Sequence, residues 1–153
     1  MGATEIEWAT DSWNPVTGCT PVSAGCDRLD QPRHWRKPRR VFVCSMGDLF
    51  HPDVPFEFIE KVFAVIAMCQ QHTFMVLTKR PENMHRFLTN RSISTLWLRI
   101  CFAASQLREG GIGSDRLWPL LNLWLGVTCE DQAAARERLK WLLKCPAAVR
   151  YVR

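Results

Sequence analysis

The stretch TFMVLTKRPE, at residues 73–82, decides the fold that this sequence predicts. Its first part, Thr73–Leu77, is a short and mostly apolar run of the length expected for a buried strand. The polar run TKR follows, and Pro81 then suits the first turn of a helix. A buried strand that leads through polar residues into a helix is one unit of a parallel α/β fold.

Similar units lie on both sides of this stretch. The predicted strands cover residues 14–18, 41–46, 73–77, 123–128 and 148–152. The predicted helices cover residues 54–69, 81–90, 92–107 and 131–144. Buried strands that alternate with amphipathic helices predict a parallel sheet with right-handed crossovers. Because the last unit is a strand without a covering helix, we predict a partial (β/α) barrel, one domain over residues 1–153, with an exposed edge.

The composition is that of a globular protein, with 47% apolar and 23% charged residues in a chain of 153. The N-terminal stretch has no apolar segment of the signal-peptide kind. No apolar run approaches the roughly 18 residues of a membrane span, so we expect a cytosolic protein with no membrane partner. The 7 cysteines are odd in number and scattered, which disfavours a disulfide scaffold.

A basic segment, LDQPRHWRKPRR at residues 29–40, precedes the second predicted strand. Together with the net charge of +5, its run Arg33–Arg40 predicts contact with the phosphates of a nucleic acid or nucleotide. The alternative is a solvated connector, which is the usual role of a charged run. Only Trp35 provides an aromatic ring in this segment, so the signal for base stacking is thin.

Polar side chains follow each predicted strand. Because the carboxyl ends of parallel strands meet at one edge, these residues should surround one cavity with the cysteine loop. We predict that they bind a cofactor: Ser45, Asp48, Thr78, Lys79, Arg80, Glu130 and Asp131. Simpler roles stay open, since Asp48 or Asp131 could cap a turn or helix, and Lys79 and Arg80 could be solvated.

A loop rich in glycine and proline, WNPVTGCTPVSAGC at residues 13–26, presents Cys19 and Cys26. Two thiols on a loop after a strand predict a metal or iron–sulfur site. A simple metal centre would complete its ligands from Cys44, His51 or Cys129, and zinc is one option.

Four segments spread over nearly the whole chain carry a resemblance to a known family. They are EIEWATDSWNPVTGC (5–19), RKPRRVFVCSMGDLFHPDVP (36–55), QHTFMVLTKRPE (71–82) and LWLGVTCEDQ (123–132). Together they resemble a phage-associated, largely uncharacterised family that is similar to the radical S-adenosylmethionine superfamily, with spore photoproduct lyase as a relative. The resemblance implies a partial (β/α) barrel, an iron–sulfur cluster on three loop cysteines, and S-adenosylmethionine on the open iron.

The chain departs from that pattern in its cysteine loop. Cys19 and Cys26 match the first two cluster cysteines, whereas Leu29 occupies the third position. The helix and strand that usually follow are missing, as is the C-terminal part of the barrel, so the resemblance implies an internally deleted, truncated member. We predict no stable four-iron cluster and no cleavage of S-adenosylmethionine. The alternatives are a non-catalytic nucleotide- or nucleic-acid-binding remnant and a simple metal-binding protein, and the exposed barrel edges predict self-association.

Overall fold

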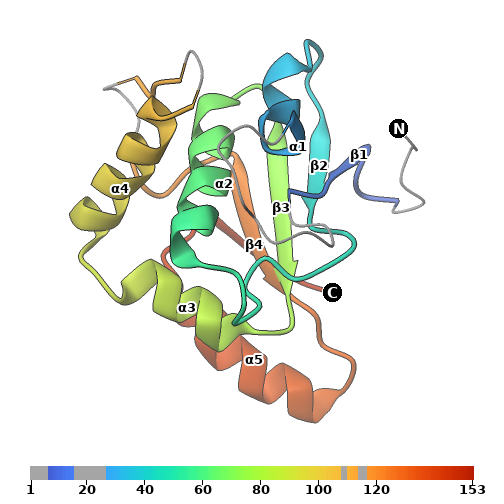
Figure 1. The fold of residues 1–153 in the computed structure, drawn as a ribbon. Helices are drawn as coiled ribbons and strands as arrows, with labels where there is room; N and C mark the ends of the chain where they lie inside the picture. The colour runs from blue at the N-terminus through green and yellow to red at the C-terminus, as the bar shows by residue number, and fades with distance from the viewer. Residues whose placement is uncertain (1–6, 16–26, 108–109, 114–116) are drawn as a thin grey trace.

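The structure, a computed structural model, describes residues 7–15, 27–107, 110–113 and 117–153. One 5-stranded sheet has the order β1-β2-β3-β4-β5, and every neighbouring pair is parallel. Strands next to one another in the sequence are therefore next to one another in the sheet (Figure 1). The strands are β1 (Asp11–Trp13), β2 (Arg40–Val43), β3 (Thr73–Thr78), β4 (Leu123–Val127) and β5 (Val149–Val152). The predicted parallel α/β fold is confirmed.

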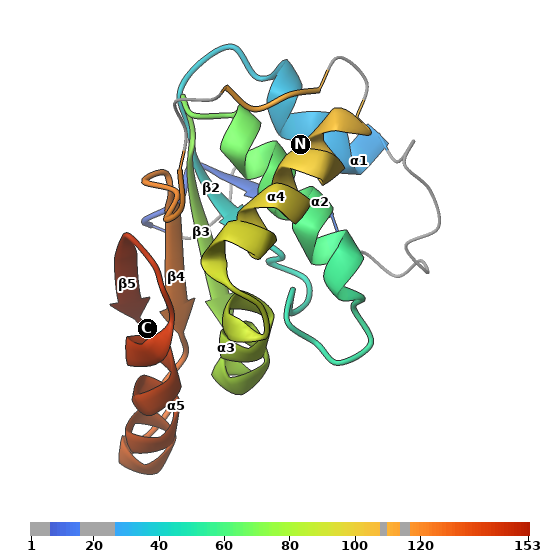
Figure 2. The ribbon, with the colours of Figure 1, turned by 90° about the vertical axis from the view of Figure 1, so that its left-hand side faces the viewer.

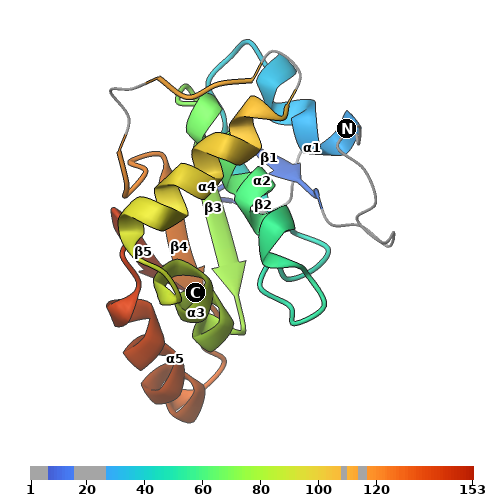
Figure 3. The ribbon, with the colours of Figure 1, turned by 60° about the vertical axis from the view of Figure 1, so that its left-hand side comes forward.

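Four long helices follow the apolar periodicity of the sequence, each within two residues of its predicted bounds. They are α2 (Phe56–Met68), α3 (Pro81–Thr89), α4 (Ile93–Ser105) and α5 (Gln132–Lys144). Figure 2 shows α2 and α4 on one side of the sheet, while α3 and α5 lie together near the carboxyl ends of β3 and β4 (Figure 3). None of the helices in the described part of the chain has both the length and the apolarity needed to cross a bilayer.

Alternating side chains give the sheet two different faces. One face carries the main core, in which Val43, Val76 and Leu125 are fully buried against α2. The opposite face carries a smaller cluster of Phe42 and Met75 with aromatic neighbours. The helix-covered face therefore holds most of the buried apolar side chains, which is where most of the hydrophobic stabilisation arises.

On this second face, the ring of Tyr151 on β5 lies across Gly126 on β4, its register partner. A Cβ atom at position 126 would stand only 2.5–2.7 Å from ring carbons of Tyr151, so only glycine fits under the ring. The Tyr151 hydroxyl is buried, with no hydrogen-bond partner among the described residues, and burial raises the pKa of this phenol.

Three features of the N-terminal part differ from the prediction. The first strand was predicted at residues 14–18, of which 16–18 lie outside the described residues; the structure has a strand at Asp11–Trp13, where Trp13 is buried in the core and donates its indole N–H to the Arg28 carbonyl (2.6 Å). The second strand ends at Val43 rather than residue 46, since Cys44 turns the backbone with a φ of 60°. Two short helices, α1 (Asp27–Asp30) and η1 (Gln31–His34), were not predicted.

Candidate functional site

A polar bridge joins β1 to β2 at their carboxyl ends. The Oδ1 atom of Asn14, directly after β1, accepts hydrogen bonds from the Ser45 hydroxyl (3.1 Å) and the Met46 amide (3.0 Å). The backbone continues the pairing, because the Cys44 amide donates to the Trp13 carbonyl at 2.8 Å. The left-handed backbone of Cys44, a conformation that non-glycine residues rarely adopt, redirects the chain toward Asn14 and places Ser45 within its reach.

Asp48 joins β2 to β3. Its carboxylate accepts from the Thr78 hydroxyl (2.8 and 2.9 Å), the Lys79 amide (3.2 Å), the Arg80 guanidinium (3.2 Å) and the Phe50 amide (2.9 Å). The Thr78 hydroxyl also accepts from the Arg80 amide at 2.8 Å. These donors occupy the lone-pair positions of both carboxylate oxygens. Asp48 therefore orients the turn after β3, and its own oxygens have no capacity left for a ligand.

An ion-pair bridge joins β3 to β4. The two oxygens of Glu130 contact the Lys79 ammonium (2.9 Å) and the Arg138 guanidinium (2.8 Å). Arg138 also donates to the carbonyl (2.7 Å) and the hydroxyl (3.1 Å) of Thr128. The hydrogen bond from Lys79, with further help from Arg138, lowers the pKa of Glu130 to about 2. The Glu130 carboxylate is therefore ionised over the whole physiological pH range.

A pocket of about 380 Å³ opens where β2, β3 and β4 end, and we call it the strand-end pocket. Phe42 and Leu77, from the face of the sheet opposite α2, form its apolar part. The polar residues that line it include Ser45, Asp48, His51, Thr78, Lys79 and Arg80. The volume lies within the range of small-molecule sites, which combine apolar walls with a few oriented polar groups.

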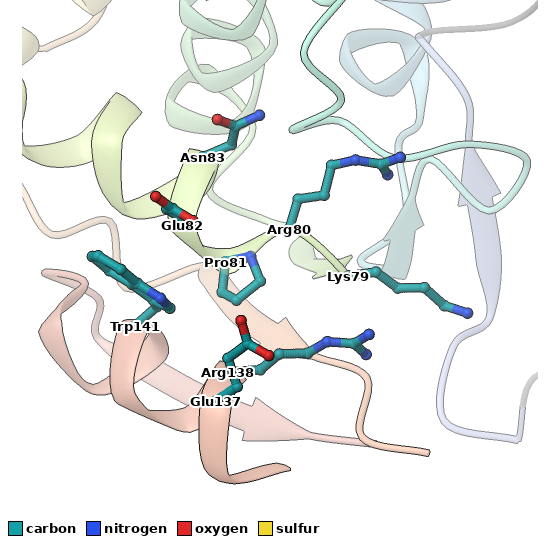
Figure 4. Close-up of a pocket in the computed structure, with 8 residues that line it drawn as sticks. All are labelled: Lys79, Arg80, Pro81, Glu82, Asn83, Glu137, Arg138 and Trp141. Atoms are coloured by element: carbon teal, nitrogen blue, oxygen red, sulfur yellow. The ribbon is translucent and has the colours of Figure 1, made fainter. Parts of the chain in front are cut away.

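A second pocket of about 370 Å³ adjoins the first between α3 and α5, and we call it the interhelix pocket (Figure 4). Its walls include Glu82 and Asn83 from α3 and Glu137, Arg138 and Trp141 from α5. Lys79 and Arg80 line both pockets, so the turn after β3 separates one from the other.

The structure brings most of the residues that were predicted to bind a cofactor to one edge of the sheet. Five of them line the strand-end pocket: Ser45, Asp48, Thr78, Lys79 and Arg80. Glu130 reaches this group through its contact with Lys79. Asp131 has a different position, because its carboxylate caps α5 by accepting from the Ala134 amide at 2.8 Å. A ligand-binding role for these residues stays a prediction.

Sequence reasoning missed Asn14 and Arg138. Asn14 directly follows β1, but the strand was predicted to run through that position, which concealed it as a strand-end residue. Arg138 lies inside α5, where a charged residue at helical spacing is indistinguishable from an ordinary solvated one. No sequence signal distinguished Arg138.

The predicted metal ligands Cys19 and Cys26 lie outside the described residues. The position that the resemblance gives to a third cluster cysteine can be examined, and there the donor set does not fit. Leu29 is 1% exposed and belongs to the main core, so side chains at this position face the protein interior. Within the described ranges, no three His, Cys, Asp or Glu side chains gather closely enough to hold a metal ion.

The basic segment lies at the opposite, amino edge of the sheet. Arg33 pairs with Asp30 (2.7 Å), and Arg39 pairs with Asp11 (2.5 Å) while its guanidinium lies over the Trp35 ring. Arg36, Lys37 and Arg40 are exposed. Two of the five cations predicted to contact phosphate thus have carboxylate partners within the chain, and the exposed three remain available to an anionic partner.

Comparison with known proteins gives one result. Residues 3–28 and 27–153 match a family described as "Protein of unknown function (DUF5131)". No curated protein and no solved structure matches the chain. Since the two matched segments together cover almost the whole sequence, this chain belongs to the DUF5131 family.

Proposed function

We propose that this chain is a radical S-adenosylmethionine-like partial (β/α) barrel that retains a strand-end ligand pocket without the cluster-dependent reaction. The ligand class is adenosyl or nucleotide small molecules, with S-adenosylmethionine as the first to test. One observation carries the proposal: the Asp48–Thr78–Arg80 network holds two cations at the rim of a pocket of about 380 Å³, where parallel strands end. Ligands bind at this edge in both barrels and open α/β sheets.

The barrel part of the proposal rests on topology. Doubly wound sheets reverse their strand order and have helices on both faces, whereas (β/α) barrels add strands sequentially and place helices outside. Here the strand order is sequential, and Figure 2 shows α2 and α4 on the same side. The opposite face, with Phe42, Met75 and Trp124, would correspond to the barrel interior.

The pocket offers matching chemistry for such a ligand. Phe42 and Leu77 supply an apolar surface for a purine or ribose, while Lys79 and Arg80 supply positive charge for a carboxylate or phosphate. His51 lines the same pocket and is 42% exposed, so its ring can contact a ligand. Asp48 and Thr78 contribute indirectly, because their hydrogen bonds fix the turn that carries Lys79 and Arg80.

Position 29 does not suit a cluster ligand. A thiolate must reach the iron from the loop surface, but residue 29 is enclosed in the core beside Trp13, which is hydrogen-bonded to Arg28. The family match also breaks into two segments that meet at residues 27–28, which supports an internal deletion next to this position.

Ligand binding is tested by titration calorimetry of the full chain with S-adenosylmethionine. We expect saturable binding that Leu77→Trp abolishes by filling the apolar wall and that His51→Gln weakens. His34→Gln serves as the matched control, because His34 is exposed at the other edge of the sheet. Unchanged affinity in Leu77→Trp, with an unchanged melting temperature, would place the ligand elsewhere.

Cluster chemistry is tested separately, by iron analysis after anaerobic reconstitution. We expect no stable iron in the unmodified chain and no gain from Leu29→Cys, because the new thiol would be enclosed in the core. Uptake of about four irons per chain with cleavage of S-adenosylmethionine would restore the enzyme hypothesis.

Nucleic acid is a second candidate partner, favoured by Arg36, Lys37 and Arg40, which are exposed in the segment that leads into β2. Its affinity should fall steeply with salt and should be lost in the triple alanine variant. Self-association through exposed sheet edges, proposed from the predicted barrel, is checked by light scattering at high protein concentration.

A further inference from the structure

We infer that Lys79 and Arg138 form a binding slot for a phosphate-type oxyanion, and that Glu130 occupies this slot as an internal competitor. The inference goes beyond the proposed function, with which it shares Lys79, because the slot combines Lys79 with Arg138 of the interhelix pocket and binds an anion in place of Glu130. Its ligand class is inorganic phosphates or the phosphate group of a nucleotide.

The geometry of the ion pairs carries the inference. Each oxygen of Glu130 contacts a different cation, Oε1 at 2.9 Å from Lys79 and Oε2 at 2.8 Å from Arg138. The cations come from separate elements, the turn after β3 and the middle of α5, so together they form two sides of one space. Figure 4 shows their side chains extending in the same direction. A phosphate oxyanion can replace both carboxylate contacts with its own oxygens.

The slot is already organised. Arg138 is 20% exposed and is fixed by two hydrogen bonds to Thr128, so its guanidinium stays in place when Glu130 leaves. Arg80 lines the same pocket and adds positive charge, as does the N-terminal end of α3, which begins at Pro81. A site that is held by its own scaffold binds without the cost of ordering its side chains.

Displacement of Glu130 requires little energy. The side chains of Lys79 and Glu130 are 62% and 49% exposed, and exposed ion pairs contribute little to stability. Glu130 stays ionised at neutral pH, since its pKa is lowered to about 2. A competing ligand must therefore carry more charge than one carboxylate, which favours phosphate monoesters and pyrophosphate over carboxylates.

The interhelix pocket can extend the ligand beyond its phosphate. Trp141 lines the same pocket, and a nucleobase would have to share its ring with Lys144, which lies over it at 4.9 Å, and with His85, whose ring packs against it. Inorganic pyrophosphate, adenosine monophosphate and adenosine are therefore the informative probes. Pyrophosphate measures binding to the slot alone, adenosine measures binding of the base without a phosphate, and adenosine monophosphate measures both together.

The test is titration calorimetry of the full chain at low ionic strength, with Glu130→Gln as the central variant. We expect Glu130→Gln to bind pyrophosphate about tenfold more tightly than the unmodified chain, and Glu130→Gln/Lys79→Met to lose this gain. The matched control is Glu137→Gln, which removes one carboxylate charge from the lining of the interhelix pocket, at a residue with no ion pair to Lys79 or Arg138. Circular dichroism and melting temperature check that each variant folds.

Equal gains in pyrophosphate affinity for Glu130→Gln and Glu137→Gln would show that the effect depends on net charge alone, and this would contradict the slot. The absence of any gain in Glu130→Gln would contradict it as well. If Trp141→Leu weakens the binding of adenosine monophosphate and leaves pyrophosphate binding unaffected, the ligand is a nucleotide. If adenosine monophosphate binds to Trp141→Leu and to the unmodified chain with equal affinity, the ligand is a free phosphate. His51→Gln separates the two proposals, because it should weaken S-adenosylmethionine binding and leave pyrophosphate binding unchanged.

Discussion

The two edges of the sheet are held together by different kinds of polar contact. At the amino edge the central residues are His72 and Asn122, which are 1% and 8% exposed. At the carboxyl edge the bridge between β3 and β4 uses Lys79 and Glu130, which are 62% and 49% exposed. The central contacts of the amino edge are thus closed to solvent, whereas those between β3 and β4 at the carboxyl edge are open to it.

The amino edge is a network in which each polar atom has a defined partner. The Asn122 amide nitrogen donates to the carbonyls of Ile66 (3.0 Å), Cys69 (3.2 Å) and His72 (3.2 Å), which joins the end of α2 to the start of β4. His72 Nδ1 accepts from the Arg39 amide at 3.2 Å, so its Nε2 carries the proton that faces the carbonyl of Pro32. These contacts fix one neutral tautomer of the imidazole.

This difference separates the contacts that stabilise the fold from the contacts that a ligand can replace. Buried polar networks are costly to break, because each lost partner leaves a desolvated group behind. Exposed contacts are exchanged for water or for a ligand at small cost. We therefore expect substitutions at the amino edge to act on folding and those at the carboxyl edge to act mainly on binding.

The largest effect is expected from Asn122→Ala at the amino edge. The buried Asn122 side chain would no longer donate to three carbonyls or accept from the Gln70 amide (3.2 Å), so the free energy of unfolding should fall by about 3 kcal/mol. Urea denaturation measures this change. Asn90→Ala is the control, since Asn90 is exposed at the end of α3. Equal losses for the two variants would remove the distinction between the edges.

Asp48→Ala should have the next largest effect. Asp48 is 14% exposed, the least of the charged side chains in the contacts of the carboxyl edge, and its loss leaves the buried Thr78 hydroxyl without its acceptor. We expect about 2 kcal/mol less stability by urea denaturation, together with loss of ligand binding, since the turn that carries Arg80 loses its support. Asp53→Ala, at a carboxylate that is 91% exposed, should leave the stability unchanged.

Acidification should weaken the amino edge through His72. Burial lowers the pKa of this imidazole below 6.5, so the unfolded chain binds the proton more readily than the folded one. Its stabilising contribution is complete above pH 6.5 and is lost as the pH falls toward the folded-state pKa, by at most about 1.4 kcal/mol per pH unit. Urea denaturation between pH 7.5 and 5 measures the slope, at pH values chosen to bracket about 6.5. His72→Gln should flatten the profile and His34→Gln should not.

The smallest effect on stability is expected from Glu130→Gln, because the carboxylate is solvent-exposed and water replaces its contacts. Its denaturation midpoint should coincide with that of the unmodified chain within experimental error. A clear loss of stability would show that the carboxyl edge depends on this bridge as the amino edge depends on Asn122.

The sequence predicted most of the fold because the buried strands and amphipathic helices carry strong periodic signals. Thr73–Thr78 and α2 were found nearly at their observed bounds. The first strand was misplaced because it is only 3 residues long and its main anchor is the single side chain of Trp13. The short helices at 27–34 were missed because Pro32 and a run of charges conceal any periodicity.

The candidate site was predicted in position but not in the roles of its residues. The topology rule brought Asp48, Lys79 and Arg80 to one pocket, as the structure shows. The sequence could not distinguish Asp48, which is saturated by its own chain, from Asp131, which caps a helix. That distinction depends on three-dimensional donor geometry, which side-chain type and spacing do not encode.

The contact between Gly126 and Tyr151 has a consequence for the history of the family. One ring fills the volume that belongs to two neighbouring positions, so neither residue is free to change alone. A relative that gains a side chain at the first position should carry a small residue at the second. The pair should therefore vary together among family members, and a chain with bulk at both positions should have its last two strands shifted apart or out of register.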